Sequence, residues 1–296
     1  MKHNMRVALV TNKLPHHKFW AYMLWKKFDV KLILHPRNNN FIERIKSKRL
    51  LRKGYRKFMA KILSFVFNSL NPSSLQNSLN RAENFFFTDY IDKYDEIPEK
   101  IKKDVSTVNC QSSVELINDN KIDVICFLGG EIAKKDFIDS PRKISLNYHS
   151  GFSPFYNGSK TIFHSVSDSK PNYSGGTLMA INEKIDGGNI LAHYLPSINE
   201  KDTATSLFMK GIVGSVKLYY VILISIIKNK QILGLPQGKP LKYVTNLDWN
   251  ILKDIQLYKF ESSRSIINFT RKEKIIFYHL NKGKTLDLNY LENLVS

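Results

Sequence analysis

The stretch Ile122-Asp-Val-Ile-Cys-Phe-Leu-Gly-Gly130, followed by Leu146-Asn-Tyr-His-Ser150, decides the fold of this chain. The first stretch is an apolar run that stops at two adjacent glycines, a pattern typical of a buried strand followed by a turn. The second stretch is a shorter buried strand that ends in polar residues. A helix is predicted just before the first stretch, at 112–120, so the chain alternates helix, strand, loop and strand. That order predicts a doubly wound α/β arrangement.

The sequence outside these stretches predicts further elements of the same kind. Residues 6–10 and 30–34 have the pattern of strands, and residues 19–28 fit a short helix between them. Residues 202–228 predict a long helix that packs on the sheet, with Asp202 as its N-cap. We therefore expect a Rossmann-like, mostly parallel sheet with helices on both faces and a small C-terminal appendage.

Two changes in composition divide the chain. Residues 44–57 contain eight Lys and Arg residues and are followed by an apolar segment at 58–70, which predicts a basic and then amphipathic helical insertion at about 41–70. The simpler interpretation is a solvated basic face, and the alternative is contact with an anionic membrane surface or with nucleic acid. Downstream, a turn-rich joint precedes a short tail. We expect a main domain at 1–230, which includes the insertion, and a small C-terminal extension at 231–296.

Composition bounds the class of protein. A length of 296 residues with 43% hydrophobic content allows one large core. The chain has 45 Lys and Arg against 26 Asp and Glu, and the resulting net charge of +19 favours anionic partners. The two cysteines, Cys110 and Cys126, do not imply a disulfide framework, and the apolar run from Leu218 to Ile227 is too short for a membrane span. We therefore expect a cytoplasmic protein without a secretion signal.

Three polar side chains are predicted to converge beyond the second strand. Asn147 and His149 are alternate residues of that strand, so both point to the same side of the sheet. A later strand at 177–181 leads into a glycine-rich turn, which brings the Asp186 carboxylate back toward the imidazole. A carboxylate at that distance would raise the pKa of His149. Taken singly these residues are weak signals, because a lone histidine is more often a satisfied core residue and a lone aspartate a turn former.

The ordered set carries more information than its members. Asn147-x-His149, the Ser/Pro/Gly-rich loop 150–158, Gly175-x-Thr177 and Asp186-x-Gly188 together resemble the folate-dependent formyltransferase family, over residues 120–230. The resemblance implies 10-formyltetrahydrofolate as co-substrate and Asn147, His149 and Asp186 as the catalytic residues, in a formyltransferase catalytic domain at 1–230. In that role the amide and the imidazole donate to the oxygen that becomes negative during formyl transfer.

The resemblance and the local chemistry also suggest binding residues. The flat pterin ring of the folate is expected between the loop after the 122–128 strand and the turn that carries Asp186. The chain lacks a dinucleotide fingerprint after its first strand and lacks metal-ligand spacing among its histidines, so neither a dinucleotide nor a metal is expected. The predicted folate contacts are Leu128, Gly129, Gly130, Glu131, Asn182 and Ile185, and the predicted substrate contacts are Ser150, Gly151, Phe152, Pro154, Tyr156, Gly158 and Lys160.

The acceptor is inferred by elimination. The loop after His149 differs from the type seen in enzymes that act on initiator tRNA, and the tail is too short for their RNA-contacting barrel. We therefore favour the amine of a nucleotide-linked amino deoxy sugar used for surface polysaccharide such as O-antigen or lipopolysaccharide, with nucleic acid as the less favoured partner. The alternatives are a methionyl-tRNA formyltransferase-like enzyme, or a basic RNA- or membrane-binding protein that has lost catalysis. Pairing of two subunits in a homodimer through the tail is left open.

Overall fold

The computed structural model describes residues 5–37, 59, 66, 74–183, 187–280 and 285–295. Apart from Met59 and Val66, the predicted basic insertion at 41–70 lies outside the described residues. The predicted contact Ile185 and the predicted catalytic Asp186 also lie outside them.

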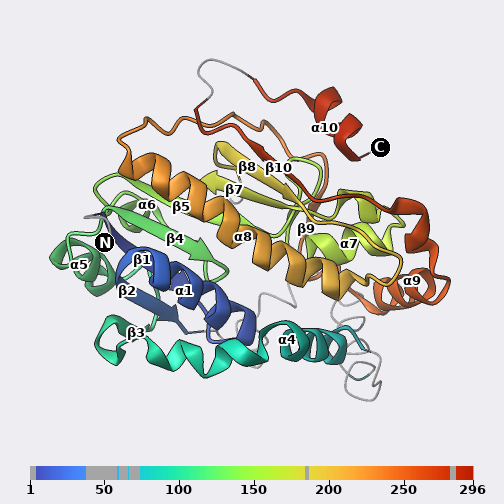
Figure 1. Ribbon diagram of the computed structural model, residues 1–296, viewed down its shortest axis with the longest axis horizontal. Helices are drawn as coiled ribbons and strands as arrows, with labels where there is room; N and C mark the ends of the chain where they lie inside the picture. The colour runs from blue at the N-terminus through green and yellow to red at the C-terminus, as the bar shows by residue number, and fades with distance from the viewer. Residues whose placement is uncertain are drawn as a thin grey trace.

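An eight-stranded sheet organises the described part of the chain, in the order β10-β8-β7-β5-β4-β1-β2-β3 (Figure 1). The strands β3, β2, β1, β4 and β5 pair in parallel, whereas β7, β8 and β10 pair antiparallel. This arrangement confirms the prediction of a mostly parallel sheet. The strand bounds are β1 Arg6–Thr11, β2 Asp29–Pro36, β3 Lys102–Val105, β4 Val124–Leu128, β5 Ile144–His149, β7 Gly176–Ala180, β8 Ile190–Leu195 and β10 Lys274–Phe277.

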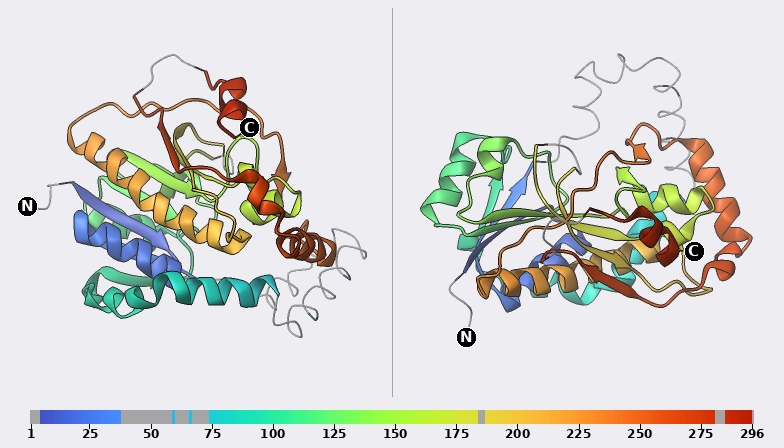
Figure 2. Two further views of the ribbon diagram at one scale, coloured as in Figure 1. Left: turned by 45° about the vertical axis from the view of Figure 1, so that its right-hand side comes forward. Right: turned by 90° about the horizontal axis from the view of Figure 1, so that it is seen from above.

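Helices cover both faces of the sheet (Figures 1 and 2). Within β1, Val7 and Leu9 pack against the helices of one face, and Ala8 and Val10 against those of the other. Burial on both faces explains why the central strands β1 and β4 are continuous apolar runs rather than alternating ones. The first face carries α1 (Pro15–Lys27), α4 (Leu75–Ile91) and α8 (Ala204–Ile227), and the second carries α5 (Gln111–Asp119) and α6 (Lys135–Ile138).

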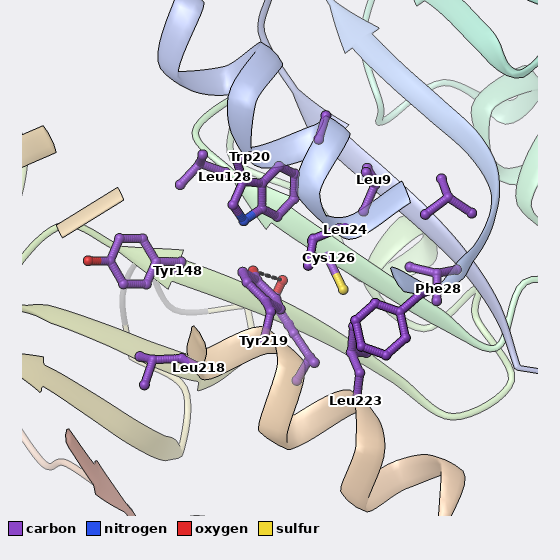
Figure 3. Close-up of a cluster of buried hydrophobic side chains, with 14 of the residues drawn as sticks. Leu9, Trp20, Leu24, Phe28, Cys126, Leu128, Tyr148, Leu218, Tyr219 and Leu223 are labelled. Carbon is purple, nitrogen blue, oxygen red and sulfur yellow. Dashed lines mark hydrogen bonds between the residues drawn. The ribbon is translucent and has the colours of Figure 1, made fainter. Parts of the chain in front are cut away.

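The long helix α8 holds the sheet at the strands that matter for the site. Tyr219 packs edge-on to Trp20 of α1 (Figure 3). Its hydroxyl donates a hydrogen bond of 2.6 Å to the carbonyl of Phe127. By length and composition α8 is apolar enough to cross a membrane, but 56% of its most apolar window is buried inside the protein. The N-cap of α8 is Thr203 rather than the predicted Asp202, whose carboxylate instead accepts from Lys210 Nζ at 2.6 Å.

The chain after α8 returns to the main body (Figure 1). The strand β9 (Tyr243–Val244) pairs with β6 (Asn157–Gly158), and β10 extends the main sheet beside β8. The helix α9 (Ile251–Ser262) lies against α7 (Thr161–Ser167), and α10 (Leu288–Val295) contributes Leu291 and Val295 to a core cluster. The tail therefore shares its packing with the domain that it follows.

Candidate active site

A cavity of about 480 Å³ opens at the carboxyl end of the parallel strands. The order of strands reverses beside β1, because β2 and β3 extend the sheet on one side and β4 and β5 on the other. Such a switch point leaves a crevice beyond the strand ends, where ligands of doubly wound folds bind. The first turn of α1 and the loops that follow β4 and β5 all contribute to the cavity wall.

Strand β5 delivers the two predicted catalytic side chains of the described part of the chain. Asn147 and His149 both line the cavity, and His149 is only 6% exposed. Tyr148, between them, points to the opposite face and donates a hydrogen bond of 2.7 Å to the carbonyl of Gly211 in α8. The alternation expected of a strand thus places the amide and the imidazole on one face.

The protonation of one imidazole nitrogen follows from its partner. The Nε2 atom of His149 lies 3.2 Å from the carbonyl oxygen of Tyr156. A carbonyl oxygen only accepts, so Nε2 carries a proton and the ring presents an N–H donor. Gly151 leaves room for this arrangement, because a Cβ at that position would lie closer than 3.0 Å to both Nε2 and the Tyr156 carbonyl.

Hydroxyl groups fix the loop that follows β5. Thr177 Oγ1 donates to the carbonyl of Gly151 at 2.6 Å and accepts from the backbone N–H of Ser153 at 3.0 Å. The hydroxyl of Thr161 also donates to the carbonyl of Ser150. The threonine of the Gly-x-Thr motif therefore acts on the shape of the loop, which places the Tyr156 carbonyl against His149.

The predicted substrate contacts divide into two groups. Ser150, Gly158 and Lys160 line the cavity, and the ammonium of Lys160 lies 5.1 Å from the centre of the Trp249 ring. The remaining four are not among the described residues of the cavity wall. Phe152 is fully buried in the cluster that includes α10, and the hydroxyl of Tyr156 donates to Asp168 at 2.9 Å. Both rings are therefore buried in the protein core. Gly151 and Pro154 lie in the same loop and are buried as well.

The five predicted folate contacts that the structure describes lie together on the wall. Gly129 and Gly130 have φ angles of +69° and +97°, a conformation that L side chains rarely adopt, so the turn after β4 requires glycine. The Glu131 carboxylate holds this turn by accepting from Thr107 Oγ1 at 2.6 Å. Asn182 lines the cavity and donates to the carbonyl of Gly187 at 3.0 Å. Leu128, Gly129, Gly130, Glu131 and Asn182 thus face one space.

The structure adds residues to the wall that sequence reasoning missed. His16 and His17 begin α1, and their only signal in the sequence is their place after the first strand of a doubly wound fold. Tyr243 arrives from the crossing segment, which we define as residues 235–244. This segment is tied to the loop after β5 by the bonds Asn157 N–H to Lys242 O at 2.9 Å and Ser159 N–H to Val244 O at 2.8 Å. A contact between residues this far apart in the chain cannot be predicted from a local sequence pattern.

Residues 92–219, which include β5 and the loop behind it, match the sequence model of the family described as Formyl transferase. This part of the chain is therefore similar to formyltransferases. The bifunctional polymyxin resistance protein ArnA of Wigglesworthia glossinidia brevipalpis is 31% identical over 124 residues, covering 42% of this chain and 19% of that protein. The methionyl-tRNA formyltransferase of Natranaerobius thermophilus is 29% identical over 117 residues, covering 40% of this chain and 35% of that enzyme. The chain thus spans well under half of either curated relative.

Solved structures of formyltransferases share the fold of this chain. A 4-N formyltransferase from Francisella tularensis superposes with a TM-score of 0.52 at 16% identity, covering 83% of this chain and 78% of that one. The sugar 3N-formyl transferase WlaRD, crystallised in the presence of dTDP and 5-N-formyl-THF, gives a TM-score of 0.50 at 16% identity, with coverage of 88% and 81%.

Proposed function

We propose that this protein is a folate-dependent N-formyltransferase that transfers a formyl group to the amine of a nucleotide-linked amino deoxy sugar. One observation carries the proposal. Asn147 and His149 lie on one face of β5, in a cavity at the switch point of the sheet, inside the segment that matches the formyltransferase family. Nucleotide-linked sugars are activated glycosyl donors, so we further propose that the product enters surface polysaccharide.

The side chains on β5 supply what formyl transfer to an amine needs. Bound 10-formyltetrahydrofolate supplies the formyl group, and the bond from the amine nitrogen to the formyl carbon forms as the bond to the folate nitrogen breaks. The amine loses a proton in this exchange and the leaving nitrogen gains one. Asn147 offers amide N–H donors to the carbonyl oxygen, where negative charge develops. The Nε2–H of His149, which faces the Tyr156 carbonyl in the free protein, is shared between that carbonyl and the formyl oxygen when the folate is bound. We keep Asp186 as the proposed partner of the imidazole.

The cavity wall suits a flat folate ring. Two adjacent glycines at the end of β4 expose main-chain atoms without side chains, and Asn182 lies on the same wall. Main-chain and amide groups of this kind hydrogen-bond the edge of a ring that carries both donors and acceptors. The presence of 5-N-formyl-THF in the WlaRD structure supports this proposal.

The rim of the cavity suits a nucleotide. Tyr243 of the crossing segment lines the cavity, yet 46% of it is exposed, as expected of a ring that stacks on a base. Lys160 lies on the same wall and provides a positive charge for a pyrophosphate. The net charge of +19 favours approach of such an anionic substrate. The dTDP in the WlaRD structure and the 4-N formyltransferase fold from Francisella tularensis support the same choice.

An acceptor panel tests the proposal. The purified protein is incubated with 10-formyltetrahydrofolate and, separately, with dTDP- and UDP-linked 3-amino and 4-amino sugars, glycinamide ribonucleotide and methionyl-tRNA. Mass spectrometry should show one added formyl group on a nucleotide-linked amino sugar, and only when the folate is present. Formylation of the tRNA alone would favour the methionyl-tRNA alternative. Failure to formylate any amine, with the folate intact, would refute the enzyme proposal.

A matched pair of variants tests the rim. Tyr243→Ala should raise KM for the nucleotide sugar by about tenfold, because base–aromatic stacking contributes roughly 1–3 kcal/mol. Tyr220→Ala is the control, since that tyrosine lies on α8, is also 46% exposed and is not among the described residues of the cavity wall. Equal kinetics for the two variants would remove Tyr243 from the nucleotide site.

A further inference from the structure

Two adjacent histidines lie on the cavity wall and have no part in the proposed formyl transfer. His16 and His17 are 7% and 5% exposed, and their ring centres are 4.1 Å apart. The Nδ1 atom of His16 pairs with the carboxylate of Glu83, a buried residue of α4. Helix α1 is thereby held to α4 at the point where it meets the cavity.

The hydrogen bonds of His17 fix its tautomer. Thr11 has one hydroxyl proton, which it donates to the carbonyl of Leu128 at 3.0 Å. The same hydroxyl oxygen lies 2.7 Å from Nδ1 of His17 and must therefore accept from it. Nδ1 carries the proton, so Nε2 of the neutral ring carries a lone pair.

The surroundings keep this ring neutral. Burial lowers the pKa of His17 well below its ordinary value, the neighbouring His16 lowers it further, and the Leu128 carbonyl opposes them with a smaller contribution that raises it. The lone pair on Nε2 is then present throughout the neutral pH range. A neutral acceptor inside a cavity suits an N–H group of a ligand, because it adds a hydrogen bond without burying a charge.

The edge of the ring that carries Nε2 faces the glycine turn after β4. A Cβ built on Gly129 would lie 2.8 Å from His17 Cε1 and 3.5 Å from Nε2. A side chain at position 129 would therefore displace or cover this edge of the imidazole. Because Gly129 has no side chain, the turn leaves an open wall for a flat ring and also leaves this edge of His17 accessible.

We propose that His17 is a ligand-binding residue of this cavity, which accepts at Nε2 a hydrogen bond from an N–H group of a bound ligand. The inference rests on the proposed function, which brings two ligands with N–H groups into one cavity, the pterin ring of the folate and the amine of the sugar. Both present the same chemistry to the imidazole, and separate measurements distinguish them.

Two amide variants separate the two nitrogens of the ring. In His17→Gln the side-chain amide reaches the place of Nε2 and retains an acceptor there. In His17→Asn it reaches only the place of Nδ1 and retains the bond to Thr11. We expect His17→Asn to weaken one ligand by about ten- to a hundredfold, the loss for a buried group left unpaired, and His17→Gln to restore most of that affinity. Thermal unfolding checks that both variants fold.

Each constant identifies one source of the N–H group. A raised Kd for 5-formyltetrahydrofolate, measured by calorimetry, assigns the group to the pterin, and a raised KM for the amino sugar assigns it to the amine. If His17→Gln, His17→Asn and the wild type have equal Kd and KM values, the inference is overturned. The proposed function still stands in that case, provided that the wild type binds both ligands. Failure of the wild type to bind either ligand overturns both.

A measurement on the wild type avoids any loss of folding. The ¹⁵N chemical shift of His17 Nε2 should be that of an unprotonated nitrogen in the free protein and should move when the ligand donates to it. A merely structural histidine would keep its Nε2 shift on addition of either ligand, and that result would overturn the inference.

Discussion

Substitution of Gly151 by alanine should disable the site without touching a ligand. The added Cβ would lie closer than 3.0 Å to Nε2 of His149 and to the carbonyl of Tyr156, and 2.9 Å from Cδ2 of the same imidazole. Ordinary contacts begin at 3.4 Å, and the carbonyl is held in the loop that Thr177 anchors, so the ring must shift by roughly 1 Å. A displacement of that size typically costs about a hundredfold in rate.

The assay follows formation of tetrahydrofolate from 10-formyltetrahydrofolate in the presence of the amino-sugar acceptor that the panel identifies. We expect kcat of Gly151→Ala to fall by about a hundredfold, with Kd for 5-formyltetrahydrofolate nearly unchanged and the free energy of unfolding lowered by about 1–3 kcal/mol through overpacking. Combined with His149→Asn, the glycine substitution should add little, because both changes act on the same donor.

Gly211→Ala serves as the control for Gly151→Ala. Its Cβ would lie on α8 at 3.2 Å from the Tyr148 hydroxyl, a contact that a small adjustment relieves, and alanine is the better helix former. Full activity of Gly151→Ala, or a loss equal to that of Gly211→Ala, would refute the reasoning that Gly151 positions the imidazole.

Three further outcomes follow from the same structure. His149→Asn should lower kcat by about 10²–10³-fold with folate binding retained, and a variant that keeps most of its rate would contradict the donor role. Burial lowers the pKa of His193 to about 3 and that of His164 to about 4, below the ordinary value of 6.5. As pH falls below 6.5, the unfolded chain therefore binds protons that the folded chain excludes. Urea titrations should show the free energy of unfolding falling by about 1.4 kcal/mol per pH unit for each of the two histidines. A free energy of unfolding that stays constant between pH 6.5 and 4.5 would count against these shifts. His164→Phe should stabilise the protein by about 1–3 kcal/mol and reduce the acid sensitivity, because both ring nitrogens of His164 are buried without a hydrogen-bond partner among the described residues. The His164 ring packs edge-on to Trp249, and a destabilised variant would show that the imidazole has a role beyond this packing.

Local patterns predicted the elements that carry the site. The apolar run before Gly129 and the alternation of Asn147 and His149 depend only on neighbours in the chain, and the structure places both at the carboxyl edge of a mostly parallel sheet. The same reasoning placed the cap of α8 one residue too early, because Thr203 forms a capping box with Ser206 while the Asp202 side chain also turns to Lys210.

Long-range packing decided the rest. Phe152 and Tyr156 have the composition of a ligand-stacking loop, but Phe152 packs in the cluster with α10 and Tyr156 is bonded to Asp168, partners that no local pattern reveals. His17 and Tyr243 reach the same cavity from opposite ends of the chain. Their place depends on strand order and on the crossing segment, which only the folded chain defines.

The position of the formyl oxygen in a complex with 5-formyltetrahydrofolate tests the central claim most directly. The formyl group of this stable analogue should bind in the cavity with its oxygen about 3 Å from the side-chain nitrogen of Asn147 and from Nε2 of His149. A pterin ring bound against the turn after β4 would accompany that position. A formyl oxygen directed away from both side chains, or a folate bound outside the cavity, would contradict the account.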